Sequence, residues 1–415
     1  MKAAPVIDLG YAKYRGRRAT SRCTVYLGVP YAEPPLGDRR FRRPVPVKST
    51  AVVDPPTHDA SHYPNFAVQG ASAVSEPGGA GSEDCLKVDL YIPDDAAPTS
   101  RYPVLVYLHG GGYRFGAPKN WPFYHWIDSR PRVVIVSVYY RLSALGFLSH
   151  PNFKDGQLAD LNVGLYDQIE ALKWVKQHIS KFGGDPEKVT ICGQSAGASS
   201  VELQLTAFGG KNKDLFRGAI AQSVYRTPVF QLEQKQAAFK ELLEEVECEY
   251  QTLEEQMHWL RTINAVELAQ AADRVYLRHR PTQGPLYDWK PVLDGDLIPD
   301  YPTKLLQAGL FADVPVIVGA TTDESLSWEE APWDVALHGQ WPFLESDDIK
   351  TLEKAYKERS LGYKEAGGDG IFRSANLVFG KVFSKAWLYR YNQPASGTTE
   401  VHHSADNWHM FKGTR

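Results

Sequence analysis

Short apolar runs alternate with helical patterns along the first half of the chain. Val104–Leu108 and Val133–Val138 are continuously apolar and rich in β-branched residues, as in strands buried on both faces. Val189–Cys192 and Val314–Val318 repeat this pattern. Ahead of the third run, apolar residues recur at steps of three and four and predict a helix that ends at two glycines. These apolar residues are Leu165, Ile169, Leu172, Val175, Ile179 and Phe182. The alternation predicts an α/β protein with a mostly parallel central sheet and helices on both faces.

Two segments depart from this alternation. Residues 54–83 are rich in proline, glycine, serine and alanine, which predicts a long surface loop. Residues 231–275 have a helical composition without strand runs, so we expect a helical insertion at about 226–285 that covers the sheet as a cap. We find no internal repeat and predict one domain over residues 1–415.

Charge and composition exclude several classes of protein. The chain has 46 Lys+Arg and 49 Asp+Glu, a formal net charge of −3, which argues against nucleic-acid binding. Its longest apolar runs are far shorter than a membrane span, and its first residues lack the apolar stretch of a signal peptide. There is no Asn-x-Ser/Thr site, and four cysteines are too few for a disulfide scaffold. We therefore expect a soluble cytoplasmic protein.

The strongest chemical pattern is Gly193-Gln194-Ser195-Ala196-Gly197, directly after the predicted strand that ends at Cys192. A serine on a sharp strand-to-helix turn is held in a strained backbone, with its hydroxyl raised above the sheet. The N–H of Ala196 then points into the same space and can donate to an oxyanion. This context predicts that Ser195 is a nucleophile.

A second pattern, His109-Gly-Gly-Gly112, follows the strand that ends at Leu108. Consecutive glycines let the main chain approach a ligand, so N–H groups here can complete an oxyanion hole with Ala196. A phosphate-binding loop is the alternative, but the Gly-x-x-x-x-Gly-Lys-Ser/Thr pattern is absent.

A serine nucleophile also needs a base, and that base needs an acid to orient it. In hydrolases with this turn the chain order is serine, acid, histidine. Composition does not choose among the histidines beyond Ser195, which are His258, His279, His338, His402, His403 and His409.

Further motifs extend over nearly the whole chain. They are, in order, Gly28–Pro35, Glu83–Leu86, His109–Gly112, Tyr140–Leu142, Gly146–Leu148, Asn162–Gln168, Phe182–Pro186, Gly193–Gly197, Gln222–Ser223, Asp294–Gly295, Asp323–Glu324 and Val401–Asp406. With these motifs the chain resembles the type B carboxylesterase and cholinesterase-like branch of the α/β hydrolases. The resemblance implies an α/β-hydrolase fold and serine esterase activity.

The resemblance also implies roles for particular residues. Ser195 matches the nucleophile and Glu324 the acid of the family. His403 matches the base, because the family places an acid three residues later, where Asp406 stands; the adjacent His402 is the rival.

Four further residues match supporting positions of the family. Gly111, Gly112 and Ala196 match the oxyanion donors, and Ser223 matches a serine beside the triad, although it could equally be a buried strand-end hydroxyl. The implied reaction passes through an acyl-enzyme and needs no metal or organic cofactor.

The chain departs from the family in its cysteines and its C-terminal part. The family's disulfide partners of Cys85 and Cys248 are absent; at the second position Trp259 stands instead. This supports a reducing compartment. Only 415 − 403 = 12 residues follow His403, which is shorter than usual for the family. We therefore expect a compact or truncated member in which the His403 loop has less support.

Aromatic residues follow the glycine triplet, at Tyr113, Phe115 and Trp121 and again at Phe123, Tyr124 and Trp126. They could line a pocket for a bulky apolar acyl or alcohol group, although ordinary packing would also explain them.

The sequence thus favours a hydrolase of small hydrophobic esters. One alternative is a biosynthetic enzyme that uses the same site for cyclisation or acyl transfer. Another is a non-catalytic cholinesterase-like interaction protein. Neither the natural substrate nor the oligomeric state follows from the residues.

Overall fold

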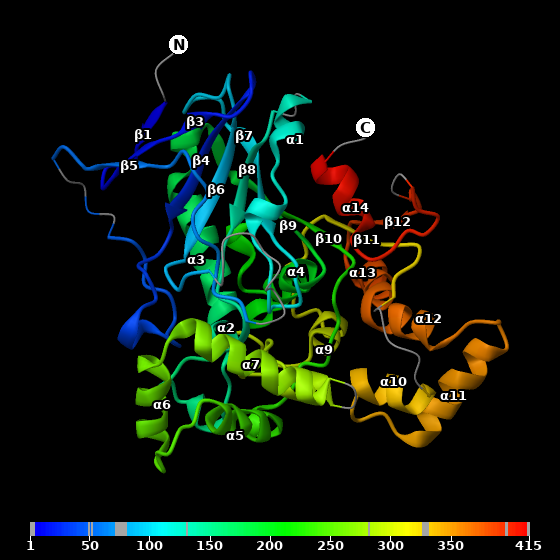
Figure 1. The fold of residues 1–415 in the computed structure, drawn as a ribbon. Helices are drawn as coiled ribbons and strands as arrows, with labels where there is room; N and C mark the ends of the chain where they lie inside the picture. The colour runs from blue at the N-terminus through cyan, green and yellow to red at the C-terminus, as the bar shows by residue number, and fades with distance from the viewer. Residues whose placement is uncertain are drawn as a thin grey trace.

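A nine-stranded sheet forms the centre of the molecule (Figure 1). The structure is a computed structural model that describes residues 5–48, 50, 53–70, 81–129, 132–280, 283–325, 332–394 and 397–412. The strand order is β12-β11-β10-β9-β7-β8-β6-β4-β3, and β1, β2 and β5 form a separate three-stranded sheet. The strands are β1 Val6–Asp8, β2 Lys13–Arg15, β3 Arg17–Arg18, β4 Cys23–Pro30, β5 Thr57–Asp59, β6 Lys87–Pro93, β7 Tyr102–Leu108, β8 Val134–Val138, β9 Gly184–Gln194, β10 Gly218–Gln222, β11 Val316–Thr321 and β12 Ala386–Tyr391.

The sheet is mostly parallel, as the sequence predicts. Every neighbouring pair from β8 to β12 is parallel, whereas β6, β4 and β3 add antiparallel strands at one edge. The register brings Leu108 opposite Gly193 and Gln194 opposite Gln222, which in turn lies opposite Gly319. The carboxyl ends of β7, β9, β10 and β11 therefore lie level, which is where ligands bind in sheets of this kind.

Helices occupy the connections between the strands. They are α1 Tyr124–Asp128, α2 Ser143–Phe147, α3 Val163–His178, α4 Ala196–Thr206, α5 Gln236–Glu245, α6 Leu253–Thr262, α7 Ala265–His279, α8 Gly284–Tyr287, α9 Pro302–Gln307, α10 Trp333–Gln340, α11 Ser346–Lys357, α12 Tyr363–Gly368, α13 Ser374–Val382 and α14 Ala405–Asn407. Figure 1 shows α5, α6 and α7 grouped at one end of the sheet, with α10, α11 and α12 as a second group beside them. Helices α5 to α7 lie within the segment 226–285 for which we expect an insertion, and α8 begins at its end.

Two apolar layers flank the sheet, because successive side chains of each strand point to opposite faces. Val104, Val106 and Ile191 belong to the larger core, which also contains residues of α3, α4 and α13. Tyr107 and Cys192 belong to a smaller core on the other face, packed with residues of α1 and with Phe411. The predicted α/β architecture with helices on both faces is confirmed.

The long loop predicted at 54–83 is only partly a loop. Residues 71–80 lie outside the described residues, but Thr57–Asp59 forms β5, which pairs with β2 in parallel. Phe66, Ala67 and Val68 are also buried. The strand escaped prediction because it is three polar, exposed residues long between prolines, which leaves no hydrophobic pattern to detect.

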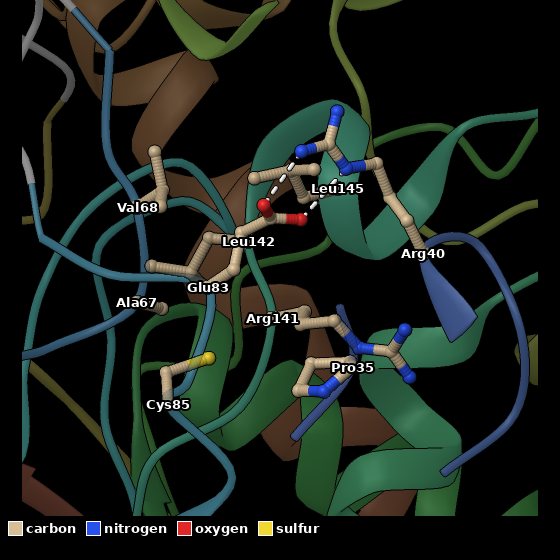
Figure 2. A pocket seen from close by; sticks show the side chains of 9 residues that line it. All are labelled: Pro35, Arg40, Ala67, Val68, Glu83, Cys85, Arg141, Leu142 and Leu145. Atoms are coloured by element: carbon tan, nitrogen blue, oxygen red, sulfur yellow. Dashed lines mark hydrogen bonds and ion pairs between the residues drawn. The ribbon is translucent and has the colours of Figure 1, made fainter. Parts of the chain in front are cut away.

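A small cavity lies where this segment meets the start of α2, and Arg40 and Glu83 are among its lining residues (Figure 2). Arg40 pairs with both carboxylate oxygens of Glu83, at 2.7 and 2.6 Å, and donates to the carbonyls of Leu260 and Ile263. The cavity has a volume of about 10 Å³, room for about one water molecule. The contacts of Arg40 attach the N-terminal segment to α6 and the residue after it. The cavity beside them is too small for a ligand.

All four cysteines are free thiols, in agreement with the missing disulfide partners. Cys23, Cys85 and Cys192 are buried and Cys248 is partly buried. Over the described ranges, none of the helices combines the length and the apolar character that a membrane crossing requires.

Candidate active site

Ser195 lies on the turn between β9 and α4, with a φ of 58° and a ψ of −123°. This left-handed backbone is costly for a residue with a side chain. The turn is close-packed: a Cβ on Gly193 would lie 2.4 Å from the carbonyl of Gly197, and one on Gly197 would lie 2.0 Å from the oxygen of Leu108. Only glycine fits at either position. The N–H of Ser195 donates to the carbonyl of Gln222 at 2.9 Å, which fastens the turn to the neighbouring strand.

The glycine-rich loop after β7 passes directly against this turn. A Cβ on Gly110 would lie 3.0 Å from Cβ of Ser195. Gly111 and Gly112 have φ values of 117° and 64°, and no described residue accepts a hydrogen bond from their N–H groups or from that of Ala196. The loop that carries Gly111 and Gly112 therefore passes beside the turn that carries Ser195 and Ala196, and the role of these three N–H groups as oxyanion donors stays a prediction.

Glu324 follows β11 and is buried, with no exposure of its side chain. Its Oε2 lies 2.7 Å from His403 Nδ1, and its Oε1 accepts from the N–H of Thr321 at 3.0 Å and from the hydroxyl of Ser223. Ser223 follows β10 and lies beside the Glu324–His403 pair.

Burial by itself would raise the pKa of Glu324. The hydrogen bond and charge of His403, followed by the hydrogen bonds from Ser223 and Thr321, outweigh burial, so the pKa lies below its usual value. Glu324 therefore remains an anion at neutral pH, as a carboxylate that orients a histidine must.

The two adjacent histidines lie in different surroundings. The ring of His403 stacks on Phe372, with centroids 4.1 Å apart, and its Nδ1 faces Glu324. His402 pairs with Glu400 at 2.8 Å, and its side chain is 59% exposed. The geometry therefore favours His403 over its rival as the partner of Glu324.

Comparison with known proteins identifies the family of the chain. The model of the carboxylesterase family matches residues 3–374. The chain belongs to the carboxylesterase family. Its fold is the α/β-hydrolase fold, because it superimposes on the crystal structure of Aspergillus niger EstA with a TM-score of 0.86 and 31% identity, over 99% of this chain and 82% of that one.

The similar proteins include an esterase, a cholinesterase and a neuroligin. The chain is 33% identical to para-nitrobenzyl esterase of Bacillus subtilis, over 93% of this chain and 78% of that one. It is 32% identical to mouse cholinesterase and 31% identical to mouse neuroligin-2, but spans only 54% and 42% of their lengths. Family and esterase relatives support a hydrolase that cleaves esters.

The sequence analysis assigned no role to two residues of the site, Gln194 and Asn407. His403 Nε2 lies 3.2 Å from Gln194 Nε2, and Gln194 Oε1 accepts from Asn407 at 3.2 Å. Among the hydrogen bonds of the described residues, none joins Ser195 to His403. Gln194 stands at the first of the two variable positions of the Gly-x-Ser-x-Gly motif, and only its place next to Ser195 could have pointed to it.

The aromatic residues predicted to line a pocket lie in different surroundings in this carboxylesterase. Tyr113 is buried under α4, where it accepts a hydrogen bond from Ser200, and its placement favours core packing. Trp121 packs on Phe411 in the smaller core. Phe115 is 38% exposed. None of the three lines a described cavity.

A larger cavity lies elsewhere, beside α4. It has a volume of about 390 Å³, and one of its lining residues is Ser199, one helical turn beyond Ser195. Its lining comes from segments that are distant in sequence and is mixed: Phe230, Trp341 and Phe343 are aromatic, whereas Glu202 and Arg226 form an ion pair. Where the structure describes the chain, it contains no group of three His, Cys, Asp or Glu residues that could hold a metal.

Proposed function

We propose that this carboxylesterase is a serine hydrolase of small hydrophobic esters, with Ser195 as nucleophile, His403 as base and Glu324 as the acid that orients it. The observation that carries the proposal is the 2.7 Å contact between His403 Nδ1 and buried Glu324, next to a serine in a strained turn. A structural role for Ser195 would not require that backbone strain.

The reaction proceeds in two steps. Glu324 keeps the proton of His403 on Nδ1, so that Nε2 can take the proton of the Ser195 hydroxyl as its oxygen attacks the ester carbonyl. His403 then gives the proton to the leaving alcohol, and an acyl group remains on Ser195. Water, activated by the same histidine, releases the acid.

The oxyanion of each tetrahedral intermediate lies among the N–H groups of Gly111, Gly112 and Ala196. These groups are held by the loop after β7 and by the first turn of α4, so they need little reorganisation during the reaction. Ser223 supports this chemistry indirectly, through its hydrogen bond to Glu324.

The cavity beside α4 supports a hydrophobic substrate. Its volume of about 390 Å³ is within the usual range for small-molecule sites, and its aromatic residues suit an apolar acyl or alcohol group, whereas Glu202 and Arg226 add a polar side. Its lining residue Ser199 lies one helical turn from Ser195, which makes it the candidate pocket for a group bonded to the reacting carbonyl. This role falls to Phe230, Trp341 and Phe343 instead of the aromatic residues after the glycine triplet.

The test is a panel of aryl esters whose acyl chains grow by two carbons at a time, with acid and alcohol products identified. A rapid quench followed by peptide mass spectrometry should find the acyl group on Ser195, and Ser195→Ala should yield no adduct. Rates should rise with acyl length until the cavity is full. Turnover that is independent of acyl size would contradict the substrate class, and acyl transfer to an alcohol in place of water would favour a biosynthetic role.

A further inference from the structure

The side chain of Gln194 bridges two parts of the site. Its Oε1 accepts from the amide of Asn407 at 3.2 Å, and its Nε2 lies 3.2 Å from His403 Nε2. Gln194 and Asn407 are 3% and 1% exposed, so water does not compete freely for these bonds. The chain of contacts therefore runs from Asn407 through Gln194 and His403 to Glu324.

The direction of each hydrogen bond selects one form of the histidine. An amide nitrogen has only donors, so Gln194 can bond His403 Nε2 only when that nitrogen carries a lone pair. Glu324 accepts the proton of Nδ1 at the same time. Together the two contacts fix the neutral ring with its proton on Nδ1, which is the form a general base needs.

Asn407 determines which end of the Gln194 amide faces the histidine. While its nitrogen donates to Gln194 Oε1, the nitrogen of Gln194 must face the ring. In the opposite orientation Gln194 Oε1 would face His403 Nε2, which only a protonated ring could satisfy. Asn407 Oδ1 has no hydrogen-bond partner in this arrangement, so it would be free to accept from a rotated Gln194.

We propose that Gln194 and Asn407 are positioning residues that hold His403 as a neutral base, with Nε2 directed at the Ser195 turn, until the serine hydroxyl takes the place of the Gln194 amide. This proposal rests on the proposed function of Ser195 and His403. The described acidic groups that interact with His403 are Glu324 and buried Asp406. The Gln194 amide is a neutral donor and bonds the unprotonated Nε2.

The proposal predicts how the activity of variants depends on pH. Gln194→Glu replaces a donor by an anion that accepts from the protonated ring, so the acidic limb of the kcat/KM profile should move to higher pH by about one unit. Asn407→Leu frees the Gln194 amide to rotate and should move the limb in the same direction by about half as much. Because Asn407 acts only through Gln194, the double variant should match Gln194→Glu.

The matched control is Gln393→Glu, which adds the same charge at an exposed position. It should leave the limb where it is. Gln194→Met, which keeps the length of the side chain without a donor, serves if the glutamate variant does not fold.

The ring proton signals of His403, assigned by their loss in His403→Gln, report the same shift by NMR titration without turnover. A titration midpoint that stays in place in both Gln194 variants would overturn the proposal, as would shifts that add fully in the double variant. If the midpoints move as expected but the wild-type chain cleaves no ester, the proposed function fails and the positioning role stands.

Discussion

The two halves of the active site are built differently. Ser195 and Glu324 follow parallel strands β9 and β11, and both are almost fully buried. His403 lies in an irregular segment before α14, and its side chain is 21% exposed. Glu324 is fixed by three donors, two of them from the sheet region, whereas His403 depends on a few side-chain contacts.

This difference shows where the site obtains its precision. The sheet holds Ser195, Glu324 and the glycine-rich loop, the proposed nucleophile, acid and oxyanion donors, as part of a packed core, which tolerates little displacement. His403 lies outside the sheet, and its ring contacts Glu324, Gln194 and Phe372. Its segment is attached to the sheet region through the hydrogen bond between Val401 and Asp323. Substitutions around Ser195 and Glu324 should therefore strongly lower kcat or prevent folding. Substitutions that loosen the His403 segment should lower kcat by smaller amounts.

The largest effect is expected from Glu324→Gln. The amide can donate to His403 Nδ1 and so favours the wrong tautomer, which should lower kcat by roughly 10³- to 10⁴-fold with little change in KM. Steady-state kinetics on an aryl ester measures it, with circular dichroism to verify folding. A loss below about tenfold would mean that Glu324 does not orient the base.

The oxyanion loop offers a matched pair of glycines. A Cβ on Gly111 would lie 1.9 Å from the oxygen of Phe115, at a φ of 117°, whereas one on Gly112 would meet nothing within 4 Å. Gly111→Ala should therefore displace the loop and lower kcat/KM by roughly 10²- to 10³-fold, the usual cost of a lost oxyanion donor. Gly112→Ala keeps its N–H and meets no clash, so only the cost of a side chain at a φ of 64° remains, and it should lose clearly less activity than Gly111→Ala. Equal losses in the two variants would contradict this account of the loop.

The attachment of the histidine segment should have a smaller effect. Asp323 Oδ2 accepts from the N–H of Val401 at 2.7 Å, and the N–H of Asp323 donates to the carbonyl of Val401 at 3.1 Å. Asp323→Ala removes one of the two bonds and should lower kcat about tenfold, because about 1 Å of misplacement weakens catalysis. Asp347→Ala, at an exposed position of α11, is the control and should leave kcat unchanged. If both variants behave alike, the segment does not depend on Asp323.

The smallest effect concerns stability and pH. The pKa of Glu324 lies below its usual value, so its ionised form stabilises the fold above the unfolded-state pKa of about 4.3. This contribution is lost as the pH falls through the lower pKa of the folded state. The Tm of the wild type should therefore exceed that of Glu324→Gln by more at pH 7 than at pH 3, by about 1 to 3 °C. A difference in Tm that does not depend on pH would contradict the assigned direction.

The sequence predicted best those features that lie in the strands of the sheet or in the turns directly after them. The runs at Val104–Leu108 and Val189–Cys192 form parts of β7 and β9, and the glycines around Ser195 reveal the turn because no other residue fits there. Such signals are local, since each follows from its own strand and turn.

Features that depend on distant contacts could not be predicted in this way. Whether Tyr113 faces a pocket or the core depends on α4, and the cavity near Ser199 is assembled from segments as distant as Phe230 and Trp341. Gln194 and Asn407 meet only because the C-terminal segment folds back over the end of β9. For the histidine, a family resemblance was needed to choose between neighbours that differ only in what they contact.

The central claim is that His403, and not His402, activates Ser195. The most direct measurement is the rate at which a fluorophosphonate probe labels Ser195 in His403→Gln and in His402→Gln, mapped by peptide mass spectrometry. We predict that the first variant loses labelling by roughly 10³-fold or more, because the serine then has no base. The second should label at the wild-type rate. Labelling that survives in His403→Gln and disappears in His402→Gln would contradict the assignment of the base.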